Sequence, residues 1–564
     1  MAARAVQVVT EVAALNRPFD YLVTDATTHV APGDRVRVSL HNRSVRGWVV
    51  GEAPLERELK PLVKWLGYGP PTNVVDLARW ASWRWYAPWS RFLATASPPR
   101  VVTALPATPA KRPLAPTQRV TLEVAPGVLT LAPTIDPLDV ILSAYQQCYD
   151  REGSLLVLVP HEAWARRVRE RLVRRGVEVC DGDDWPRVRA QWPVVVATRG
   201  GALAPTPRVA GAVVLDADDE SFRSTSAPTW HAVDVVRERC QRDDAPYWLT
   251  SFFPSPALSV ASTTAHLGDG SDWPQVEVVD RRQGDPHDGA LTREVVLAAH
   301  RALASSEPVA VVIILQRLGA GRLLACAHCG ELARCAQCAQ AEQDVEGQLA
   351  CRERHDVRAR FCRACGATKF RSVRSGVTTL ARDVSLQLAQ PVSEITASSS
   401  DAPLARVVVG TEAVLTRVRR ASLVIFADFD QYLLAPRAQA RRQAVSALAR
   451  AGRLVGARRA PRGLVMLQTR RSGDVVVTCA VAGNFEPLRL EEIEDARLLG
   501  LAPFGARADV AGEGAPAFVA ALPDDIVVRP SGTSFTLGAP NVTRLAEALA
   551  STPRPPGSLR VAVE

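Results

Sequence analysis

Seven of the eleven cysteines lie in one short stretch of the chain. Three pairs have the spacing Cys-x-x-Cys, which brings two thiolates to the separation of two corners of a tetrahedron, so each pair can supply half of a Zn–S₄ shell. Gly330 and Gly366 directly follow two of the pairs, where a tight turn favours glycine. The spacing predicts zinc rather than disulfides or free buried thiols. The cluster consists of Cys326, Cys329, Cys335, Cys338, Cys351, Cys362 and Cys365.

A fourth pair is incomplete. Arg354 stands three positions after Cys351, where a partner cysteine would complete the pair, and a guanidinium does not bind zinc. His355 follows directly, and imidazole is an ordinary zinc ligand. Two alternatives remain open, a Cys₃His site that uses His355 or an incomplete site beside a solvent-facing histidine. We expect His328, inside the first pair, to be a surface residue.

The elements around the cluster predict several packed domains, because 564 residues exceed a single core. Alternating strands and turns, such as 5–9 and 35–38, indicate a small β-barrel at the start. Continuous apolar strands separated by helices, such as 155–159 and 309–315, indicate parallel sheets covered on both faces. The expected fold class is a multidomain α/β protein. It has an N-terminal β-barrel-like domain, two RecA-like parallel-sheet lobes with a zinc-binding insertion, and a C-terminal α/β or α+β domain.

Composition shifts suggest where these domains meet. A proline-rich stretch is typical of a linker and separates the barrel domain from the first lobe. The expected segments are an N-terminal domain at 1–97, a linker at 98–117, a first lobe at 118–255, a second lobe at 256–475 with its insertion at 324–370, and a C-terminal domain at 476–564.

The net charge of +9 suits a polyanionic partner such as nucleic acid. Arginine supplies almost all of the positive charge, since the lysines are only Lys60, Lys64, Lys111 and Lys369. No apolar run approaches the length of a membrane span, and the start has no uninterrupted apolar segment of the kind found in signal peptides. We therefore expect a cytoplasmic protein without a membrane partner.

Several short motifs occur in a recognisable order along the chain. The segments are Arg17-Pro-Phe-Asp-Tyr21, Val194-Val-Val-Ala-Thr-Arg199, Trp230-His-Ala-Val-Asp234, Val408-Val-Gly-Thr411 and Ala449-Arg-Ala-Gly-Arg453. Together with the cysteine cluster behind Leu315-Gln-Arg-Leu-Gly319, they resemble the PriA (primosomal protein N′) family of replication-restart proteins. The family's winged-helix domain has no counterpart, because only the proline-rich linker stands in its place.

The resemblance implies two zinc ions in an interleaved brace. By position, one site resembles Cys326, Cys329, Cys362 and Cys365, and the other resembles Cys335, Cys338 and Cys351, with His355 as the candidate fourth ligand.

The resemblance also implies a DNA-binding pocket, because the family's N-terminal domain binds the 3′ end of a leading strand. Phe19, Asp20, Tyr21 and Lys60 match this pocket. Phe19 and Tyr21 could stack on a base while Asp20 bonds its edge. Residue types alone favour barrel core for both aromatic side chains, and the resemblance reverses this preference. His41 stands where the family has a glycine, which predicts an altered pocket.

The motor residues of the family are missing. A P-loop needs Gly-Lys followed by Ser or Thr, and no lysine of this chain follows a glycine. The expected loop at 129–137 instead contains prolines and Asp136, which would repel phosphate. The Asp-Glu box reads Asp216-Ala-Asp-Asp219, so Ala217 replaces the glutamate. We expect no catalytic residues and no use of ATP, although Arg450 and Arg453 match possible arginine fingers.

The sequence thus predicts a replication-restart protein that recognises stalled forks and repair intermediates and promotes replisome reloading, without helicase activity. Its expected partners are forked or single-stranded DNA with a 3′ end, and primosome and helicase-loading proteins. Two alternatives remain, an ATP-dependent 3′-to-5′ helicase with an atypical nucleotide site and a zinc-ribbon scaffold for protein interactions.

Overall fold

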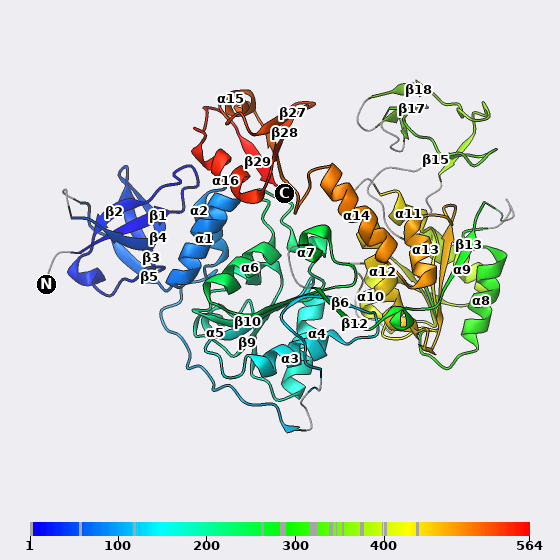
Figure 1. The fold of residues 1–564 in the computed structure, drawn as a ribbon, viewed down its shortest axis with the longest axis horizontal. Coiled ribbons are helices and arrows are strands. Elements are labelled where there is room, and N and C mark those ends of the chain that lie inside the picture. Colours follow the sequence, from blue (N-terminus) through cyan, green and yellow to red (C-terminus); the bar gives the residue numbers. More distant parts are fainter. Residues whose placement is uncertain are drawn as a thin grey trace. The chain divides into compact units, whose positions relative to one another are not determined.

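The computed structural model describes residues 4–55, 59–116, 120, 122–260, 264–282, 289–315, 324–337, 342–345, 347–351, 355–372, 377–396, 399, 403–435 and 439–564. Cys338, Arg354 and the turn at 316–319 lie outside the described residues. The chain forms two compact units (Figure 1). The first unit comprises 1–131, 135–267 and 489–564, and the second comprises 132–134 and 268–488.

The N-terminal strands form an antiparallel barrel, as expected. The strands are β1 (Ala5–Thr10), β2 (Phe19–Leu22), β3 (Arg35–Leu40), β4 (Arg43–Ala53) and β5 (Lys64–Gly67), in the order β2-β1-β4-β3-β5. A parallel bridge between Leu22 and Pro61 joins β2 to the segment before β5 and so closes the sheet. Side chains such as Val6, Val36 and Val49 fill the interior. Helices α1 (Thr72–Arg84) and α2 (Trp89–Thr95) follow.

The first lobe is a seven-stranded parallel sheet in the order β12-β6-β11-β10-β7-β9-β8. Its strands are β6 (Gly127–Leu131), β7 (Ser154–Leu158), β8 (Val179–Asp181), β9 (Val194–Ala197), β10 (Val209–Val214), β11 (Tyr247–Ser251) and β12 (Thr264–Leu267). Alternate residues of β7 enter different cores: Leu155 packs with helices α3 (Pro137–Gln147) and α4 (Glu162–Arg174), and Leu156 packs on the side of α6 (Ala232–Arg242). Both faces are therefore buried, which explains the continuous apolar strands.

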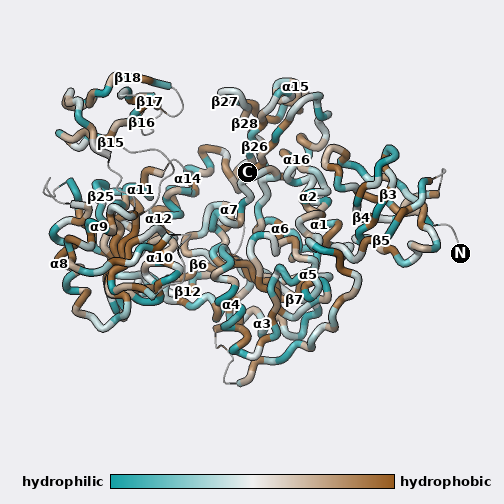
Figure 2. The backbone as a smooth tube through the Cα atoms, turned by 180° about the vertical axis from the view of Figure 1, so that it is seen from behind, coloured by the Kyte–Doolittle hydropathy of each residue, from teal (hydrophilic) through white to brown (hydrophobic). Residues whose placement is uncertain are grey.

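The second lobe is a six-stranded parallel sheet in the order β13-β25-β22-β14-β21-β20. Its strands are β13 (Val276–Asp280), β14 (Val311–Ile314), β20 (Val392–Ile395), β21 (Val407–Gly410), β22 (Leu423–Phe426) and β25 (Leu464–Thr469). Helices α8 (Arg293–Leu303) and α9 (Val377–Leu388) share a core with the sheet, and α12 (Ala440–Val455) packs on β22 and β25. Figure 2 shows hydrophobic colour concentrated along the strands of this sheet. The expected pair of parallel-sheet lobes is confirmed.

The cysteine-rich insertion lies between β14 and α9. It contains β15 (Leu324–Cys326), β16 (Glu342–Val345), β17 (Gln348–Cys351), β18 (Val357–Ala359) and β19 (Phe370–Ser372). Its hydrophobic core is small: among the described residues of the insertion, the core cluster comprises Leu324, Ala333 and Leu349, with Phe370 packed alongside. So little apolar burial predicts that another interaction stabilises the insertion.

The C-terminal sheet is antiparallel, in the order β27-β28-β26-β29, and carries α15 (Ala515–Ala520) and α16 (Val542–Ser551). Its strands are β26 (Ala506–Ala511), β27 (Val527–Ser531), β28 (Ser534–Ala539) and β29 (Arg560–Val563). Two boundaries differ from expectation. Strand β12 pairs with β6 and extends the first lobe to Leu267, and the compact C-terminal region begins near Arg489 rather than at 476. Among the described residues, no helix combines the length and apolar character needed to cross a bilayer.

Candidate metal centres and nucleic-acid interface

Four cysteine sulfurs converge as the spacing predicts. The Sγ atoms of Cys326 and Cys365 lie 3.5 Å apart, and those of Cys329 and Cys362 lie 3.6 Å apart. All four sulfurs lie within 4.8 Å of one another. Zn–S bonds of about 2.3 Å would place tetrahedral thiolates roughly 3.8 Å apart. The four sulfurs therefore have the spacing of a zinc shell and could hold the ion.

The backbone around these sulfurs has the geometry of two matching turns. Gly330 and Gly366 have φ values of 77° and 76°, which side chains other than glycine rarely adopt. The Gly330 N–H donates to the Cys326 carbonyl at 3.0 Å, and the Gly366 N–H donates to the Cys362 carbonyl at 2.8 Å. Backbone N–H groups, first that of Cys329 and then that of His328, lower the pKa of the Cys326 thiol to about 6. The turn thus favours the thiolate of Cys326, which is the form that binds metal. A hydrogen bond with the Glu331 backbone acts to lower the pKa of Cys329, but the neighbouring sulfurs outweigh it and raise that pKa to about 12.

A second group brings Cys335, Cys351 and His355 together. One ligand atom from each lies within 4.8 Å of the others, and both cysteines are only 3% exposed. The Cys351 N–H donates to the Asp356 carbonyl at 2.9 Å, which brings the chain back to Cys351 and places His355 beside it. Cys338, the further candidate ligand of this site, lies outside the described residues. His355 is exposed and lies beside both cysteines as a third donor, and the Cys₃His site stays a prediction.

A buried ion pair connects the two groups. The Glu342 side chain is 0% exposed and accepts hydrogen bonds from the Arg358 Nε at 3.0 and 3.1 Å. Arg363, which lies between Cys362 and Cys365, pairs with Asp356 at 2.5 Å and approaches Glu342 at 3.7 Å. A buried carboxylate is tolerated only with such partners. Sequence reasoning missed this network, because its members have no characteristic spacing.

The barrel places the residues of the expected DNA pocket on and beside β2. Tyr21 is 3% exposed, and its hydroxyl donates to the Ser39 carbonyl at 3.1 Å. The ring of Tyr21 is therefore barrel core, which overturns the expectation that it stacks on a base. Phe19 and Asp20 are half-buried, and Lys60 is exposed. The Leu22 N–H donates to the Lys60 carbonyl at 2.9 Å, so Lys60 lies beside the end of β2.

Two further features shape the surroundings of this strand. The Arg17 guanidinium lies 5.1 Å from the centre of the Phe19 ring, within cation–π range. His41 and Asn42 form the turn between β3 and β4 with φ values of 46° and 61°. This left-handed backbone is the conformation that glycine adopts most easily, which explains why the family pattern has glycine where this chain has His41.

The loop at the expected nucleotide position is closed by its own side chains. The Asp136 carboxylate accepts the N–H of Leu138 at 3.0 Å, as an N-cap of α3, and also pairs with Arg171. The hydrogen bond to Asp136 and the negative charge of that carboxylate raise the pKa of the Arg171 guanidinium, although partial burial acts to lower it. A P-loop would offer this helix N-terminus to phosphate. Arg171 was not predicted, because it stands 35 positions away in the chain and no local pattern links it to Asp136.

The aspartates after β10 are also engaged in structural contacts. Asp218 accepts the Ser251 hydroxyl at 2.8 Å and the Ser255 N–H at 3.1 Å. Asp219 accepts the Ser221 N–H at 2.9 Å. Ala217 is fully buried. The hydrogen bonds of Asp218 and Asp219 hold the loop in its conformation. Ala217 stands where the helicase pattern has a glutamate.

Comparison with known proteins relates this architecture to one family. Residues 7–98 match the family model of the PriA 3′ DNA-binding domain. The replication restart protein PriA of Treponema pallidum (strain Nichols) is 25% identical over 418 residues, which cover 65% of this chain. The chain is related to the PriA family. The alignment spans 61% of the length of the Treponema PriA, so less than two thirds of that protein has a counterpart here.

The match to the PriA 3′ DNA-binding domain spans the barrel and the two helices that follow it, α1 and α2, since α2 ends at Thr95. Solved structures are more distant. The DUF1998 helicase MrfA bound to DNA is 12% identical with a TM-score of 0.37, covering 82% of this chain and 70% of that one. Saccharomyces cerevisiae Dbp5 bound to Gle1 is 12% identical with a TM-score of 0.36, covering 66% and 88%. The relationship to PriA therefore rests on the sequence matches.

Proposed function

We propose that this chain is a replication-restart protein that recognises forked DNA through a free 3′ end and helps to reload the replication machinery, without hydrolysing ATP. The observation that carries the proposal is the match of residues 7–98 to the PriA 3′ DNA-binding domain. The expected partners are forked or single-stranded DNA and the proteins that load the replicative helicase.

Contact with a 3′ terminus would come from the outer side of β2. Side chains alternate along a strand, so Asp20 faces away from Tyr21 and the barrel core. Its carboxylate is suited to accept a hydrogen bond from a base edge or a terminal hydroxyl. Lys60, beside the end of this strand, is exposed and suited to a phosphate contact. Phe19 lies on the same face as Tyr21 and packs against the barrel core.

The two cysteine groups would hold one zinc ion each, which makes the insertion a folded module. Zinc would supply binding energy for folding, because the hydrophobic core of the insertion is small, with three buried apolar residues among those that the structure describes. Arg363 links the two groups through its ion pairs with Asp356 and Glu342.

Side-chain contacts at the expected phosphate position support independence from ATP. Phosphoryl transfer needs a phosphate cradle, a Mg²⁺ ligand and a group that positions the nucleophile. Asp136 occupies the start of α3 and is held there by Arg171, and Ala217 supplies no carboxylate. Each lobe then acts as a support for the domain attached to it, the first for the barrel and the second for the zinc module.

Two measurements test this function. Affinity should be higher for a forked DNA with a free 3′-hydroxyl than for the same fork with a blocked 3′ end or for blunt duplex. ATP turnover should not rise above background when that fork is added. Equal affinity for all three DNAs would contradict the 3′-end proposal. Fork-stimulated hydrolysis that disappears in Arg450→Ala would favour the ATP-dependent helicase instead.

A further inference from the structure

Two arginine pairs meet at one edge of the second lobe. Strands β13 and β25 are parallel neighbours, and Asp280 at the end of one pairs in register with Thr469 at the end of the other. Arg281 and Arg282 follow the first strand, and Arg470 and Arg471 follow the second. Arg282, Arg470 and Arg471 therefore extend from adjacent turns at the carboxyl ends of the strands, the edge where open α/β sheets bind their ligands. The Arg281 guanidinium donates instead to the carbonyls of Gly289 and Ala290.

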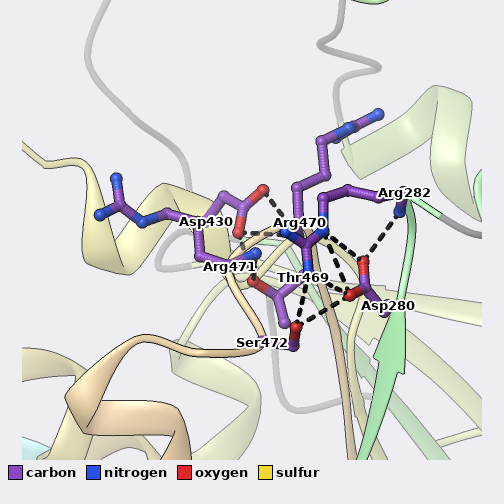
Figure 3. Close-up of polar contacts among 7 residues, drawn as sticks. All are labelled: Asp280, Arg282, Asp430, Thr469, Arg470, Arg471 and Ser472. Carbon is purple, nitrogen blue, oxygen red and sulfur yellow. Dashed lines mark hydrogen bonds and ion pairs between the residues drawn. The ribbon is translucent and has the colours of Figure 1, made fainter.

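The carboxylates in this cluster hold the turns in place (Figure 3). Asp430, at the start of α11 (Asp430–Leu433), accepts the backbone N–H of Arg470 with both oxygens at 3.1 Å and also the hydroxyl of Thr469. Asp280 accepts the Ser472 hydroxyl at 2.8 Å and pairs with Arg282 at 2.6 Å. Asp430 is thus used on the backbone and on a hydroxyl, and Asp280 is paired with Arg282. Among the described residues, neither acid pairs with the side chain of Arg470 or Arg471.

Several of the guanidinium groups are accessible. The Arg282 side chain is 60% exposed and the Arg471 side chain is 49% exposed, with Asp474 at 3.6 Å from the latter. The Arg470 side chain extends away from both aspartates in Figure 3, and no carboxylate within the described residues pairs with it. A side chain built on Gly473 would meet nothing within 4 Å, so there is open space beside this turn.

We propose that Arg470 and Arg471, supported by Arg282, form a binding site for the phosphates of single-stranded nucleic acid. A guanidinium offers paired N–H groups that match phosphate oxygens, and the anchored turn presents them without further ordering of the backbone. The proposal rests on the proposed DNA-binding function and adds a contact outside the barrel. Burial, together with the neighbouring Asp430, raises the pKa of Asp428, whereas the charges of Arg470 and Arg281 lower it.

The test compares two arginine pairs of equal charge in the full-length protein. Arg470→Gln with Arg471→Gln is set against Arg419→Gln with Arg420→Gln, an exposed pair in the turn before β22, at the opposite edge of the same sheet. Each double variant lowers the net charge by two. Loss of two phosphate contacts should weaken binding of single-stranded DNA about ten-fold at physiological salt and reduce the slope of log K against log salt by roughly 1.4. The control pair should change neither quantity.

A third variant separates positioning from net charge. Asp430→Ala removes a negative charge, so bulk electrostatics predicts tighter DNA binding. Our proposal predicts several-fold weaker binding, because the turn that carries Arg470 loses its anchor. Zinc content and circular dichroism that match the parent show that each variant is folded.

The outcomes distinguish this site from the proposed function. A parent protein that binds no DNA refutes the proposed function. A parent that binds, with Arg470→Gln/Arg471→Gln no weaker than the control pair, refutes this site alone. Inorganic phosphate titrated at constant ionic strength should show no saturable binding. If it does, and only the Arg470 and Arg471 variant loses it while keeping its DNA affinity, the site takes a free anion and the nucleic-acid assignment is overturned.

Discussion

Replacement of His355 by alanine should weaken one zinc site and leave the other intact. His355 lies with Cys335 and Cys351 in a group whose ligand atoms are within 4.8 Å of one another. Structural zinc sites bind with roughly 10–16 kcal/mol, which is about 3 kcal/mol for each of four ligands. Losing one ligand should therefore raise the dissociation constant of that site about a hundred-fold.

His328 supplies the matched control. It is an exposed histidine in the same insertion, and only its backbone N–H contacts a ligand, the Cys326 sulfur at 3.4 Å. His328→Ala removes the same side chain without removing a donor. Zinc should be measured in both variants by metal analysis during titration with a competing chelator. The parent and His328→Ala should each release zinc in two steps. In His355→Ala, one of these steps should occur at a lower concentration of the chelator.

The opposite outcome would show that His355 does not bind zinc. If His355→Ala retains two zinc ions with the same release curve as His328→Ala, then His355 is a bystander. The fourth ligand would then come from another group, and the convergence with Cys335 and Cys351 would have no metal-binding role.

The remaining predictions concern the other site, the barrel and the first unit. Cys362→Ser should lose the all-cysteine site and make the insertion sensitive to limited proteolysis, because thiolate binding there is folding energy; unchanged zinc and protease resistance would contradict this. Asp20→Ala should weaken binding to a free 3′ terminus by about 1–3 kcal/mol and leave internal duplex binding unchanged, measured by fluorescence anisotropy. Burial alone would raise the pKa of Asp234, but His231 and Arg84 outweigh it and hold the pKa at about 2. Asp234 should therefore stabilise the fold above pH 4, and its advantage over Asp234→Asn in chemical unfolding should shrink as the pH falls towards 2; a difference independent of pH would refute this.

The metal ligands could be predicted from the sequence because the information is local. A Cys-x-x-Cys turn fixes two sulfurs through its own backbone, and Gly330 and Gly366 adopt the positive φ expected after such pairs. His355 could be proposed for the same reason, since it stands only four positions from Cys351. What joins Cys326 to Cys365 is the pairing of β15 with β19, and spacing alone cannot reveal this long-range contact.

The DNA pocket shows where residue types mislead. Phe19 and Tyr21 are two positions apart on one strand, so they share a face, and Asp20 must face the other way. The alternation could have excluded a pocket in which all three contact the same base. It could not show which face is inward, because this depends on the closure of the barrel between Leu22 and Pro61.

Contacts between distant residues explain why the first lobe can persist without a nucleotide. In a working motor, the start of α3 and the loop after β10 must exchange partners with phosphate, magnesium and water. Here Arg171 holds Asp136 at the first position, and Ser251 holds Asp218 at the second. Each contact belongs to the folded chain itself, so no ligand is needed to satisfy these acids. Both faces of the sheet remain packed, and a lobe with these properties is suited to rigid support rather than to cycles of opening and closing.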